Sequence, residues 1–331
     1  MVTSTFALFS VLALVTKSTL STNYCPPFQK HVNKTKCVQI SNLNISKLTT
    51  QLFVKLDWKN ITCINLHDNE IRSIQNGLFS KFINLKILQV KNSPVLGAGI
   101  RDGLEDIFNS TRLTTLCLEN VGLNTSLVKY IIDLLPKNLW HLIFRNNSIE
   151  YFSVDFIRKL KIRTLILSSN KNLNFSIGSI PKTYTWLRTL DLSHTGFFSN
   201  STLCPKNKTI MQNLRNLSLN GNLLRLSFID RKECNYRKLK HLSLSDCHLE
   251  DGLHNTSFFN FPKLGSLNLN GLKNTSKIQL PTFQKNEQLK VLNLNNISYN
   301  FPPSDENTAA FKYLTELTKL QMNQWNLSQW N

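Results

Sequence analysis

The sequence predicts an α/β solenoid, in which one short unit is stacked many times along the chain. The motif LxxLxLxxN begins at Leu214, and the same motif with Cys in place of the final Asn begins at Leu239. The two copies are 25 residues apart, and a variable segment follows each of them. A fixed period in this range with such a strand motif is the signature of leucine-rich repeats, which form a horseshoe with a concave parallel β-sheet.

Apolar residues occupy positions 1, 4 and 6 of eleven successive copies of the motif. The copies begin at Ile61, Leu85, Leu113, Leu139, Ile162, Leu187, Leu214, Leu239, Leu264, Leu289 and Leu317. Positions 4 and 6 point to the same face of a strand, so they are predicted core positions. Burying each such side chain contributes about 1.5–3 kcal/mol, whereas ordering each residue costs about 1–2 kcal/mol. One unit therefore cannot fold alone, and the repeats must stack.

Position 9 is expected to close each strand with an inward side chain that binds the neighbouring backbone. Asn is the best residue for this role, and it is present at Asn69, Asn147, Asn170 and Asn222. Ser93, Thr195 and Cys247 are weaker substitutes, while Val121, Leu272, Ile297 and Trp325 cannot serve. The second half of each repeat varies, which predicts an irregular convex side without long helices. Pro94, Gly97 and Gly99 mark one expected bulging loop, and Pro302 and Pro303 mark another.

The ends of the chain differ from the repeats. Phe6 to Val15 is an apolar run of 10 residues, which is typical of a signal peptide and too short to span a membrane. We assign residues 1–22 to the signal peptide, 23–60 to an N-terminal cap and 61–331 to eleven repeats, of which the last is incomplete and uncapped. The cap holds Cys25 and Cys37, which are predicted to form a disulfide. An uncapped last repeat favours a fragment of a longer protein.

Sequons for N-glycosylation support an extracellular chain. They number fourteen, more than the composition would give by chance, and no later segment is long and apolar enough to span a membrane. Glycosylation is predicted at Asn33, Asn44, Asn60, Asn109, Asn124, Asn146, Asn174, Asn200, Asn207, Asn216, Asn255, Asn274, Asn296 and Asn326.

The other cysteines are assigned by their repeat positions. Cys204 and Cys234 occupy corresponding loops of adjacent repeats, which predicts a second disulfide. Cys247 replaces a position-9 Asn and is expected to be a buried thiol. Cys63 and Cys117 lie at outward strand positions two repeats apart, so they are expected not to bridge to each other. Pairing of such a thiol with a missing segment or partner stays open.

The chain is strongly basic, with 39 Lys and Arg against 20 Asp and Glu and a net charge of +19. Nucleic acid, anionic lipid and sulfated glycan are the partners that such a charge favours. Arg163, Arg188, Arg215 and Lys240 occupy position 2 of four consecutive repeats, which predicts a basic column and a candidate anion site. Solvated side chains on a generally basic protein are the plainer interpretation. A glycan on Asn216, beside Arg215, would crowd a long ligand.

A tryptophan and four histidines at outward strand positions are further candidates for ligand contact. Trp140 at position 2 is a candidate contact anchor. His67, His141, His194 and His241 could make binding acid-dependent, although ordinary exposed histidines are the plainer interpretation. The sequence has no catalytic motif, metal-ligand spacing or phosphate loop, so we expect no enzyme activity, no metal and no cofactor.

The chain resembles the ectodomain of a Toll-like receptor. The resemblance rests on the signal peptide, the Cys25–Cys37 cap, repeats such as LFSKFINLKILQVKNS (78–93) and NLRNLSLNGNLL (213–224), uneven repeat lengths, the Cys204 and Cys234 loops and dense sequons. It implies innate immune sensing of a microbial or nucleic-acid ligand by a receptor that dimerises. The transmembrane helix and cytoplasmic signalling domain of that family are not in this sequence. The alternative is a secreted adhesion or matrix protein that binds protein or sulfated glycan. The expected location is secreted, extracellular or in the endosomal lumen.

Overall fold

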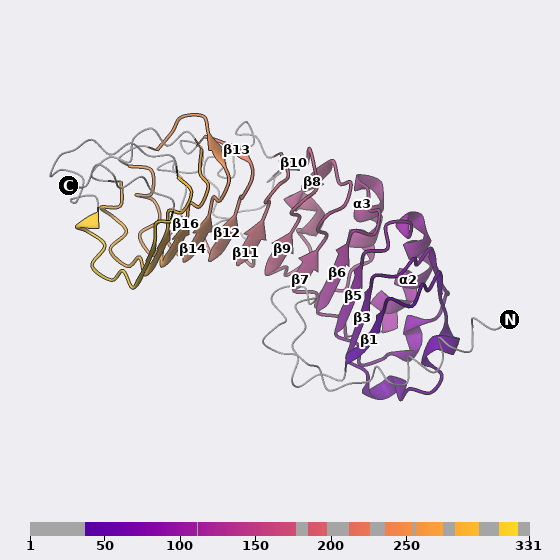
Figure 1. Ribbon diagram of the computed structural model, residues 1–331. Helices are drawn as coiled ribbons and strands as arrows, with labels where there is room; N and C mark the ends of the chain where they lie inside the picture. The colour runs from indigo at the N-terminus through magenta and orange to yellow at the C-terminus, as the bar shows by residue number, and fades with distance from the viewer. Residues whose placement is uncertain are drawn as a thin grey trace. The chain divides into compact units, whose positions relative to one another are not determined.

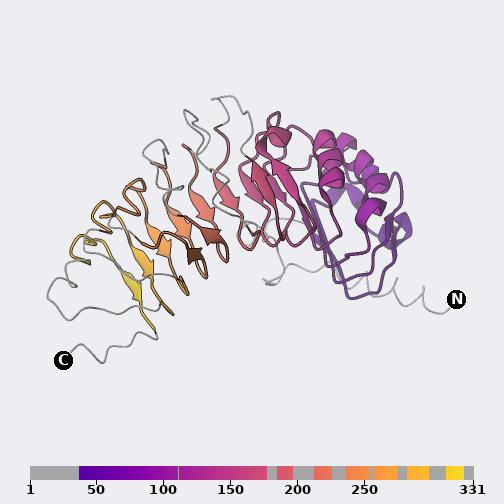
Figure 2. The same cartoon turned by 90° about the horizontal axis from the view of Figure 1, so that it is seen from above.

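The computed structural model describes residues 37–110, 112–176, 185–196, 212–225, 236–253, 256–273, 282–297 and 311–323. The chain forms two compact units. Unit 1 comprises residues 1–149 and 159–162, and unit 2 comprises residues 150–158 and 163–331. Within each unit, successive repeats contribute one strand each to a parallel sheet (Figures 1 and 2). This is the leucine-rich-repeat solenoid that the sequence predicts.

Unit 1 has long strands on one side and helices on the other. Its sheet has the order β1-β3-β5-β6-β7, with bounds Cys37–Ser41, Cys63–His67, Ile87–Lys91, Thr115–Glu119 and His141–Ile143. A small sheet pairs β2 (Lys47–Leu48) with β4 (Ser73–Ile74). The helices are η3 (Thr50–Phe53), η4 (Trp58–Asn60), η5 (Phe79–Lys81), η6 (Gly97–Ile100), α2 (Arg101–Ser110) and α3 (Thr125–Leu134). Helices α2 and α3 lie side by side, away from the sheet (Figure 1).

Unit 2 is built from shorter strands. Its sheet has the order β9-β11-β12-β14-β16-β17-β18, with bounds Thr164–Ile166, Thr189–Asp191, Asn216–Ser218, His241–Ser243, Ser266–Asn268, Val291–Asn293 and Lys319–Gln321. Two small sheets pair β8 (Tyr151–Ser153) with β10 (Asn174–Ser176), and β13 (Leu223–Leu224) with β15 (His248–Leu249). Val154–Ile157 form the 3-10 helix η7, and no α-helix occurs among the described residues of this unit.

The predicted apolar positions form the core. Positions 1, 4 and 6 are buried in the ten copies that begin at Ile61 to Leu289. In the last copy Leu320 is 43% exposed. Behind the sheet, aromatic rings stack from one repeat to the next, and the Phe258 and Phe283 ring centroids lie 5.8 Å apart. The register is also as predicted, since Leu217 pairs with Leu190 on one side and with Leu242 on the other. The repeat therefore fixes both the strand order and the face that is buried.

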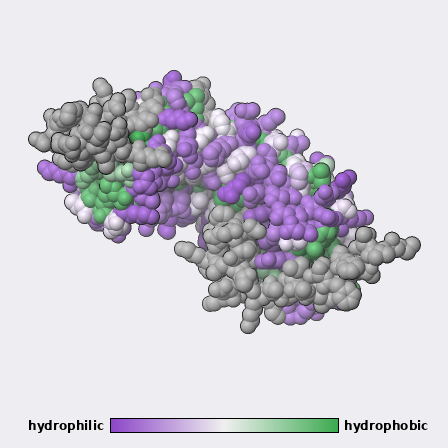
Figure 3. All heavy atoms as spheres, in the orientation of Figure 1, coloured by the Kyte–Doolittle hydropathy of each residue, from purple (hydrophilic) through white to green (hydrophobic). Residues whose placement is uncertain are grey.

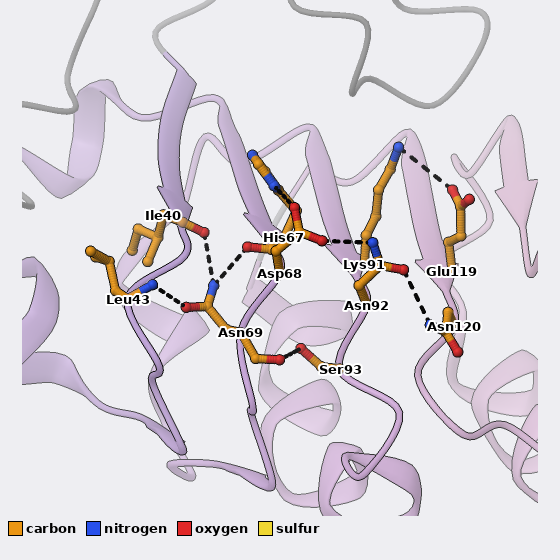
Figure 4. Close-up of polar contacts among 10 residues, drawn as sticks. All are labelled: Ile40, Leu43, His67, Asp68, Asn69, Lys91, Asn92, Ser93, Glu119 and Asn120. Atoms are coloured by element: carbon orange, nitrogen blue, oxygen red, sulfur yellow. Dashed lines mark hydrogen bonds and ion pairs between the residues drawn. The ribbon is translucent and has the colours of Figure 1, made fainter.

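Position 9 closes the strands as the sequence predicts. The Asn69 Nδ2 donates to the carbonyls of Ile40 and His67, both at 3.0 Å, while its Oδ1 accepts from the Leu43 amide at 3.1 Å (Figure 4). Asn147 makes the same kind of contacts. The substitutes bind more sparsely: the Ser93 hydroxyl donates to the Asn69 carbonyl at 2.9 Å. Each Asn thus ties its own strand to the preceding repeat.

Position 8 has a backbone requirement that sequence reasoning did not use. In every repeat with a described position 8 the residue has φ between 50° and 65°. Glycine, Asn and Asp tolerate this left-handed region best, and they supply most of these positions. The Asn and Asp side chains also connect along the strand ends. The Asn92 Nδ2 donates to Asp68 Oδ1 at 2.7 Å, and Asn120 Nδ2 donates to Asn92 Oδ1 at 3.2 Å (Figure 4).

The convex side of unit 1 differs from the prediction of irregular loops. The segment that holds Gly97 and Gly99 is helical, and α2 follows it directly. Buried Ile100, Leu104 and Ile107 recur at helical spacing, and this periodicity outweighs the two glycines. Helix α3 buries Leu127, Val128, Ile131 and Ile132. Asn124 caps α3, because its Oδ1 accepts from the Leu127 amide at 2.9 Å. The second predicted loop, at Pro302 and Pro303, lies outside the described residues.

The cap disulfide predicted between Cys25 and Cys37 is wrong, because Cys37 is bonded to Cys63. The reason is the register of β1, which lies inside the predicted cap but pairs with β3 as a repeat strand does. Cys37 stands directly opposite Cys63 in that pair. Cys117 is disulfide-bonded as well. Cys247 is free and buried, as predicted, and burial raises its pKa to about 11. Cys25, Cys204 and Cys234 lie outside the described residues.

The described surface is mainly hydrophilic. On the face drawn in Figure 3, hydrophilic side chains dominate, and a hydrophobic patch lies at the end of unit 2 that carries β18. Six of the sequon asparagines are exposed: Asn44, Asn60, Asn124, Asn146, Asn174 and Asn296. Asn216 is half-buried. The side chains of the other seven lie outside the description. A search of the described helices finds none that is long and apolar enough to cross a membrane.

Candidate ligand-binding surface

The outward face of the unit 2 sheet is polar and partly open. The middle residue of each strand from β9 to β17 points into the core and is buried, as Leu217 and Leu242 are in β12 and β14. The flanking residues face outward, and Ser, Thr, Asn and Asp predominate among them. From β11 to β17 all of these flanking residues are half-buried except His241, which is exposed. Side-chain hydrogen bonds link this row, including Ser193 Oγ to Ser218 Oγ at 2.7 Å.

The four predicted cations are aligned at the start of the strands. The Arg188 amide donates to the Arg163 carbonyl at 2.8 Å, the Arg215 amide to the Arg188 carbonyl at 2.8 Å, and the Lys240 amide to the Arg215 carbonyl at 2.8 Å. We call Arg163, Arg188, Arg215 and Lys240 the basic column. Three of its side chains are exposed, and that of Arg188 is half-buried. The backbone ladder therefore holds four positive side chains on adjacent strands.

Arg188 is held differently from the other members of the basic column. Its Nη1 donates to the Thr185 carbonyl at 2.7 Å, with longer contacts to the Leu187 and Asn213 carbonyls. Desolvation lowers the pKa of Arg188, and the nearby charges of Arg215 and Arg163 lower it further. The three guanidinium groups are therefore close enough to repel one another. Arg188 gains no carboxylate partner from these contacts, only neutral carbonyl oxygens.

The charge of the basic column is not neutralised at its C-terminal members. Among the ion pairs of the described residues, none involves Arg215 or Lys240. Beyond Lys240 the next repeat places Gly265 at position 2, which has no side chain. Lys290 follows, and its Nζ lies 3.7 Å from Glu316 Oε2. The uncompensated charge thus ends at Lys240.

One further cation at this edge was missed from the sequence. The Lys238 Nζ donates to Asn213 Oδ1 at 2.7 Å, and Asn213 Nδ2 donates to the Thr185 carbonyl at 3.0 Å. Thr185 is the residue whose carbonyl also binds Arg188. Lys238 lies directly before the repeat motif, outside the positions whose residue types the motif defines, so the motif does not identify it. The loops before β11, β12 and β14 therefore support the same edge that carries the basic column.

Asn216 stands beside the basic column on β12. Its Nδ2 donates to Thr189 Oγ1 at 2.9 Å, across to the neighbouring strand β11. An N-linked glycan would be attached to this Nδ2 atom, which keeps one hydrogen after modification. A glycan on Asn216 would therefore be attached to a half-buried side chain amide on the outward face of β12.

Other predicted surface residues are placed apart from the basic column. Trp140 is 38% exposed and belongs to unit 1, where its amide donates to the Thr114 carbonyl at 2.9 Å. His67, also in unit 1, is buried, and its Nδ1 lies 2.7 Å from Asp68 Oδ2 (Figure 4). The expectation of an exposed ring is therefore wrong for His67. In unit 2, partial burial and then the charge of Lys240 lower the pKa of His241.

The described residues contain no group of three or more His, Cys, Asp or Glu side chains that could hold a metal ion. The hydrogen bonds of the Arg188 guanidinium are to neutral carbonyl oxygens, which leave its positive charge in place. This arrangement is suited to holding an anionic group by charge and hydrogen bonds.

Solved structures share the fold of this chain. A chain of the octameric complex of latrophilin 3, Unc5D and the leucine-rich-repeat protein FLRT2 superposes with a TM-score of 0.58 and 17% identity, covering 88% of this chain and 85% of that one. An internalin, InlF of Listeria monocytogenes, gives a TM-score of 0.52 and 16% identity over 98% and 89% of the two chains. At these identities the likeness is one of fold.

A third similar structure is the complex of TLR13 with ssRNA13. It gives a TM-score of 0.50 and 19% identity over 87% of this chain, which spans 40% of the TLR13 chain. No protein-family model and no curated protein matches the sequence. The comparisons thus define the fold as a leucine-rich-repeat solenoid, and two of these three similar structures are complexes.

Proposed function

We propose that this chain is an extracellular recognition module, of the Toll-like receptor type, that binds an anionic ligand through the basic column of unit 2. The observation that carries the proposal is the alignment of four cations on adjacent strands, where the described residues give Arg215 and Lys240 no ion pair. Like charges about 5 Å apart repel by about 1 kcal/mol per pair in water, so an anion that bridges them relieves repulsion as well as gaining contacts. The proposed location is the extracellular space or the endosomal lumen.

Binding, rather than catalysis, is the role that the site chemistry favours. The polar row of Ser, Thr and Asn beside the basic column offers hydrogen bonds to sugar or base edges, while the cations offer charge to phosphates. The TLR13 complex with single-stranded RNA supports a nucleic acid as the ligand class, as an analogy of fold. The FLRT2 complex supports the alternative, a secreted adhesion or matrix module that binds protein or sulfated glycan.

Salt dependence and charge removal test the proposal together. Glycosylated chain from a secretory host would be titrated with single-stranded RNA and, separately, with heparin. Binding to an anionic polymer should weaken steeply between about 50 and 200 mM salt, and removal of one phosphate contact should reduce the slope by about 1. The test variant is Arg215→Ala with Lys240→Ala. The matched control is Lys273→Ala, an exposed cation of the same unit outside the basic column.

Each arm has a result that contradicts the proposal. Equal RNA affinity for the double variant and the control would remove the basic column as the site. Heparin binding with a steep salt slope, without RNA binding, would select the adhesion alternative. Binding of neither polymer would leave the column as solvated charge and would reject an anionic ligand.

The sugar at Asn216 supplies a second test of the same surface. Ser218→Ala removes the sequon while the Asn216 amide stays in place. If the glycan crowds the basic column, the variant should bind a long RNA more tightly, and a trinucleotide with unchanged affinity. Ser46→Ala, which removes the exposed Asn44 sequon in unit 1, is the control. Equal long-RNA affinity for Ser218→Ala and wild type, with glycosylation of Asn216 verified by mass spectrometry, would contradict crowding.

A further inference from the structure

The outward face of β16 and β17 carries four asparagines that lie in two pairs. Asn268 and Asn293 stand opposite each other in the register of these strands. Asn270 and Asn295 follow two residues later, where the ladder continues, because the Gly271 amide donates to the Asn295 carbonyl at 2.8 Å. All four residues are half-buried. We call them the amide block.

The amide block presents unused hydrogen-bond donors. The Oδ1 atoms of Asn268 and Asn293 each accept from the backbone amide two residues later, at 3.2 and 3.0 Å. The Oδ1 atoms of the other two accept from Asn296 Nδ2 at 3.1 Å and from the Asn323 amide at 2.7 Å. No described residue accepts a hydrogen bond from any of the four Nδ2 groups. Four uncharged NH2 groups are therefore available on one face.

The equivalent side chains nearer the basic column bond to one another. Ser193 Oγ lies 2.7 Å from Ser218 Oγ, and Ser243 Oγ donates to Asn220 Oδ1 at 2.7 Å. Outward groups there satisfy each other across neighbouring strands. The Nδ2 groups of the amide block do not, so water or a ligand must accept from them.

Gly265 leaves an open space beside the amide block. It occupies position 2, directly before β16, where each of the other ten repeats has a side chain. A Cβ at Gly265 would have the Lys240 carbonyl oxygen as its nearest contact at 3.7 Å, which is an ordinary distance. Packing therefore does not require glycine here. A strand glycine without such a requirement is typical of a place where a ligand or another backbone approaches closely.

The amide block also differs from the basic column in charge. Its side chains are neutral, and Gly265 interrupts the row of cations before it. The next position-2 cation is Lys290, whose Nζ lies 3.7 Å from Glu316 Oε2. Beyond it, Lys319 of β18 is exposed. A neutral donor surface is complementary to the carbonyl groups of an uncharged ligand rather than to a row of phosphates or sulfates.

We propose that the amide block binds an extended, uncharged peptide segment of a partner protein through the peptide main chain. Successive carbonyls of an extended peptide point to opposite edges, and those on one edge recur about every 6.6 Å. Asn268 and Asn270 are two residues apart along a strand, so their spacing is the same, and the neighbouring strand is about 4.8 Å away. A peptide that lies along the strands between the two asparagine pairs thus presents four successive carbonyls to four Nδ2 donors.

The same amides also serve the peptide N–H groups. Each Oδ1 of the amide block accepts one hydrogen bond within the described chain, and a carbonyl oxygen has two lone pairs. The second lone pair accepts from a peptide N–H, a donor that a polyanion does not offer. The space at Gly265 lets the peptide continue past the end of the amide block. This surface is separate from the basic column and binds a different class of ligand.

An array of random uncharged hexapeptides, N-acetylated and C-amidated, tests the proposal. Wild-type protein and Ser298→Ala, which lacks the Asn296 sequon, are both applied, because a glycan on Asn296 would border the amide block. The expected result is binding of a subset of hexapeptides. Their affinity should change by less than about twofold between about 50 and 200 mM salt, whereas binding of a polyanion falls steeply over that range. No bound hexapeptide with either protein would overturn the proposal.

Variants then locate the site for the bound hexapeptides. Asn268→Asp removes an Nδ2 donor and keeps the Oδ1 acceptor, and Asp191 already makes this contact in β11 by accepting from the Ser193 amide at 3.0 Å. The variant should lose about tenfold in affinity. Asn220→Asp is the matched control, because it adds the same charge outside the amide block and keeps its acceptor. Equal affinity losses in the two variants would reject the amide block as the site.

A second variant keeps the test decisive if Asn268→Asp does not fold. Gly265→Lys places at position 2 the residue type that Lys240 and Lys290 have in the neighbouring repeats, so it should fold normally and still weaken hexapeptide binding at least about tenfold by filling the open space. Unchanged hexapeptide affinity in Gly265→Lys would contradict the proposed path of the peptide. Chitin tetrasaccharide, an uncharged sugar chain with amide carbonyls, is tested as a competitor. If it binds at the amide block and no hexapeptide does, the proposal of a peptide is overturned.

Discussion

The two units are built from the same repeat, yet they use their outward strand faces in opposite ways. Unit 1 has strands of up to five residues, helices α2 and α3 behind them, and an outward face whose central residues are buried. Unit 2 has strands of three residues, no α-helix among its described residues, and an outward face that is polar and partly open. The sheet alone does not create a binding surface. What lies on the sheet decides whether the repeat is structural or available for recognition.

The charges on the outward faces can be compared as well. In unit 1 Lys91 Nζ lies 3.5 Å from Glu119 Oε2. Burial lowers the pKa of Lys91, and Glu119 offsets part of that effect. In unit 2 the members of the basic column adjoin one another, and within the described part of the chain Arg215 and Lys240 form no ion pair. Charge that is paired contributes to local structure, whereas unpaired charge of one sign is available to a ligand.

The largest effect is expected from Leu242→Asp in unit 2. Leu242 is 2% exposed, between Leu217 and Leu267 of the adjacent strands. An unpaired buried carboxylate costs several kcal/mol, about as much as a whole domain's stability. We expect unit 2 to unfold while the α-helical circular dichroism of α2 and α3 in unit 1 survives. Ser243→Asp, on the outward side of the same strand, should leave both intact. Loss of the helical signal together with unit 2 would show that the units are not separately stable.

A smaller effect distinguishes the strand closures of the two units. Asn147 in unit 1 makes four hydrogen bonds, donating to the Leu118 and Arg145 carbonyls at 2.9 Å and accepting from the Val121 and Leu123 amides at 3.0 and 3.1 Å. At about 0.5–1.5 kcal/mol each, Asn147→Ala should lower the free energy of unfolding by about 2–5 kcal/mol.

The comparison residue is Cys247 in unit 2, at the equivalent position. Its Sγ donates to the Leu219 carbonyl at 3.1 Å, which is a weak bond, so Cys247→Ala should cost about 1 kcal/mol. Chemical denaturation of both variants measures the difference. If the two substitutions cost the same, the number of hydrogen bonds at position 9 does not set the contribution of that side chain to stability.

Features of the fold and of the candidate site that recur in every repeat can be predicted from the sequence, and features that occur in one repeat cannot. The core positions, strand register and position-9 contacts follow from a repeat near 25 residues, and the structure confirms them. The alignment of Arg163, Arg188, Arg215 and Lys240 on adjacent strands follows from the same period. The contact of Arg188 with the Thr185 carbonyl does not, because it depends on a loop that differs in every repeat.

Two errors have specific physical causes. Gly97 and Gly99 predict a loop, but the helical spacing of buried Ile100, Leu104 and Ile107 outweighs them. The spacing of Cys25 and Cys37 predicts a cap disulfide, but β1 aligns with the repeats, since Val38 and Ile40 match the core pair Ile64 and Leu66. Alignment of β1 would have placed Cys37 opposite Cys63. To predict which cysteines pair in this fold, the register of the strands must be used before the spacing of the cysteines along the sequence.

A modest effect should separate the capping of α3 from glycosylation at the same residue. Asn124 Oδ1 caps α3, while a glycan would use Nδ2, so both can be present at once. Asn124→Ala removes the cap and the sequon, and should lower stability by about 1 kcal/mol more than Ser126→Ala, which removes the sequon alone. Thermal unfolding of both glycoforms measures this. An equal loss of thermal stability in the two variants would assign the effect to the glycan and not to the capping of α3.

The smallest expected effect concerns acid, and it belongs to unit 2. Partial burial and then the charge of Lys240 lower the pKa of His241 below its ordinary value. The unfolded chain therefore binds this proton more readily than the folded chain, so stability rises with pH through this interval and is lost as pH falls below about 6.5. Lys240→Gln should raise the pKa of His241, as read from its imidazole resonances in an NMR titration, while Lys273→Gln should not. A bound anion should raise it as well, because it neutralises Lys240. If RNA binds but the pKa of His241 does not change, the RNA does not neutralise Lys240. It then contacts the basic column at the opposite end, near Arg163.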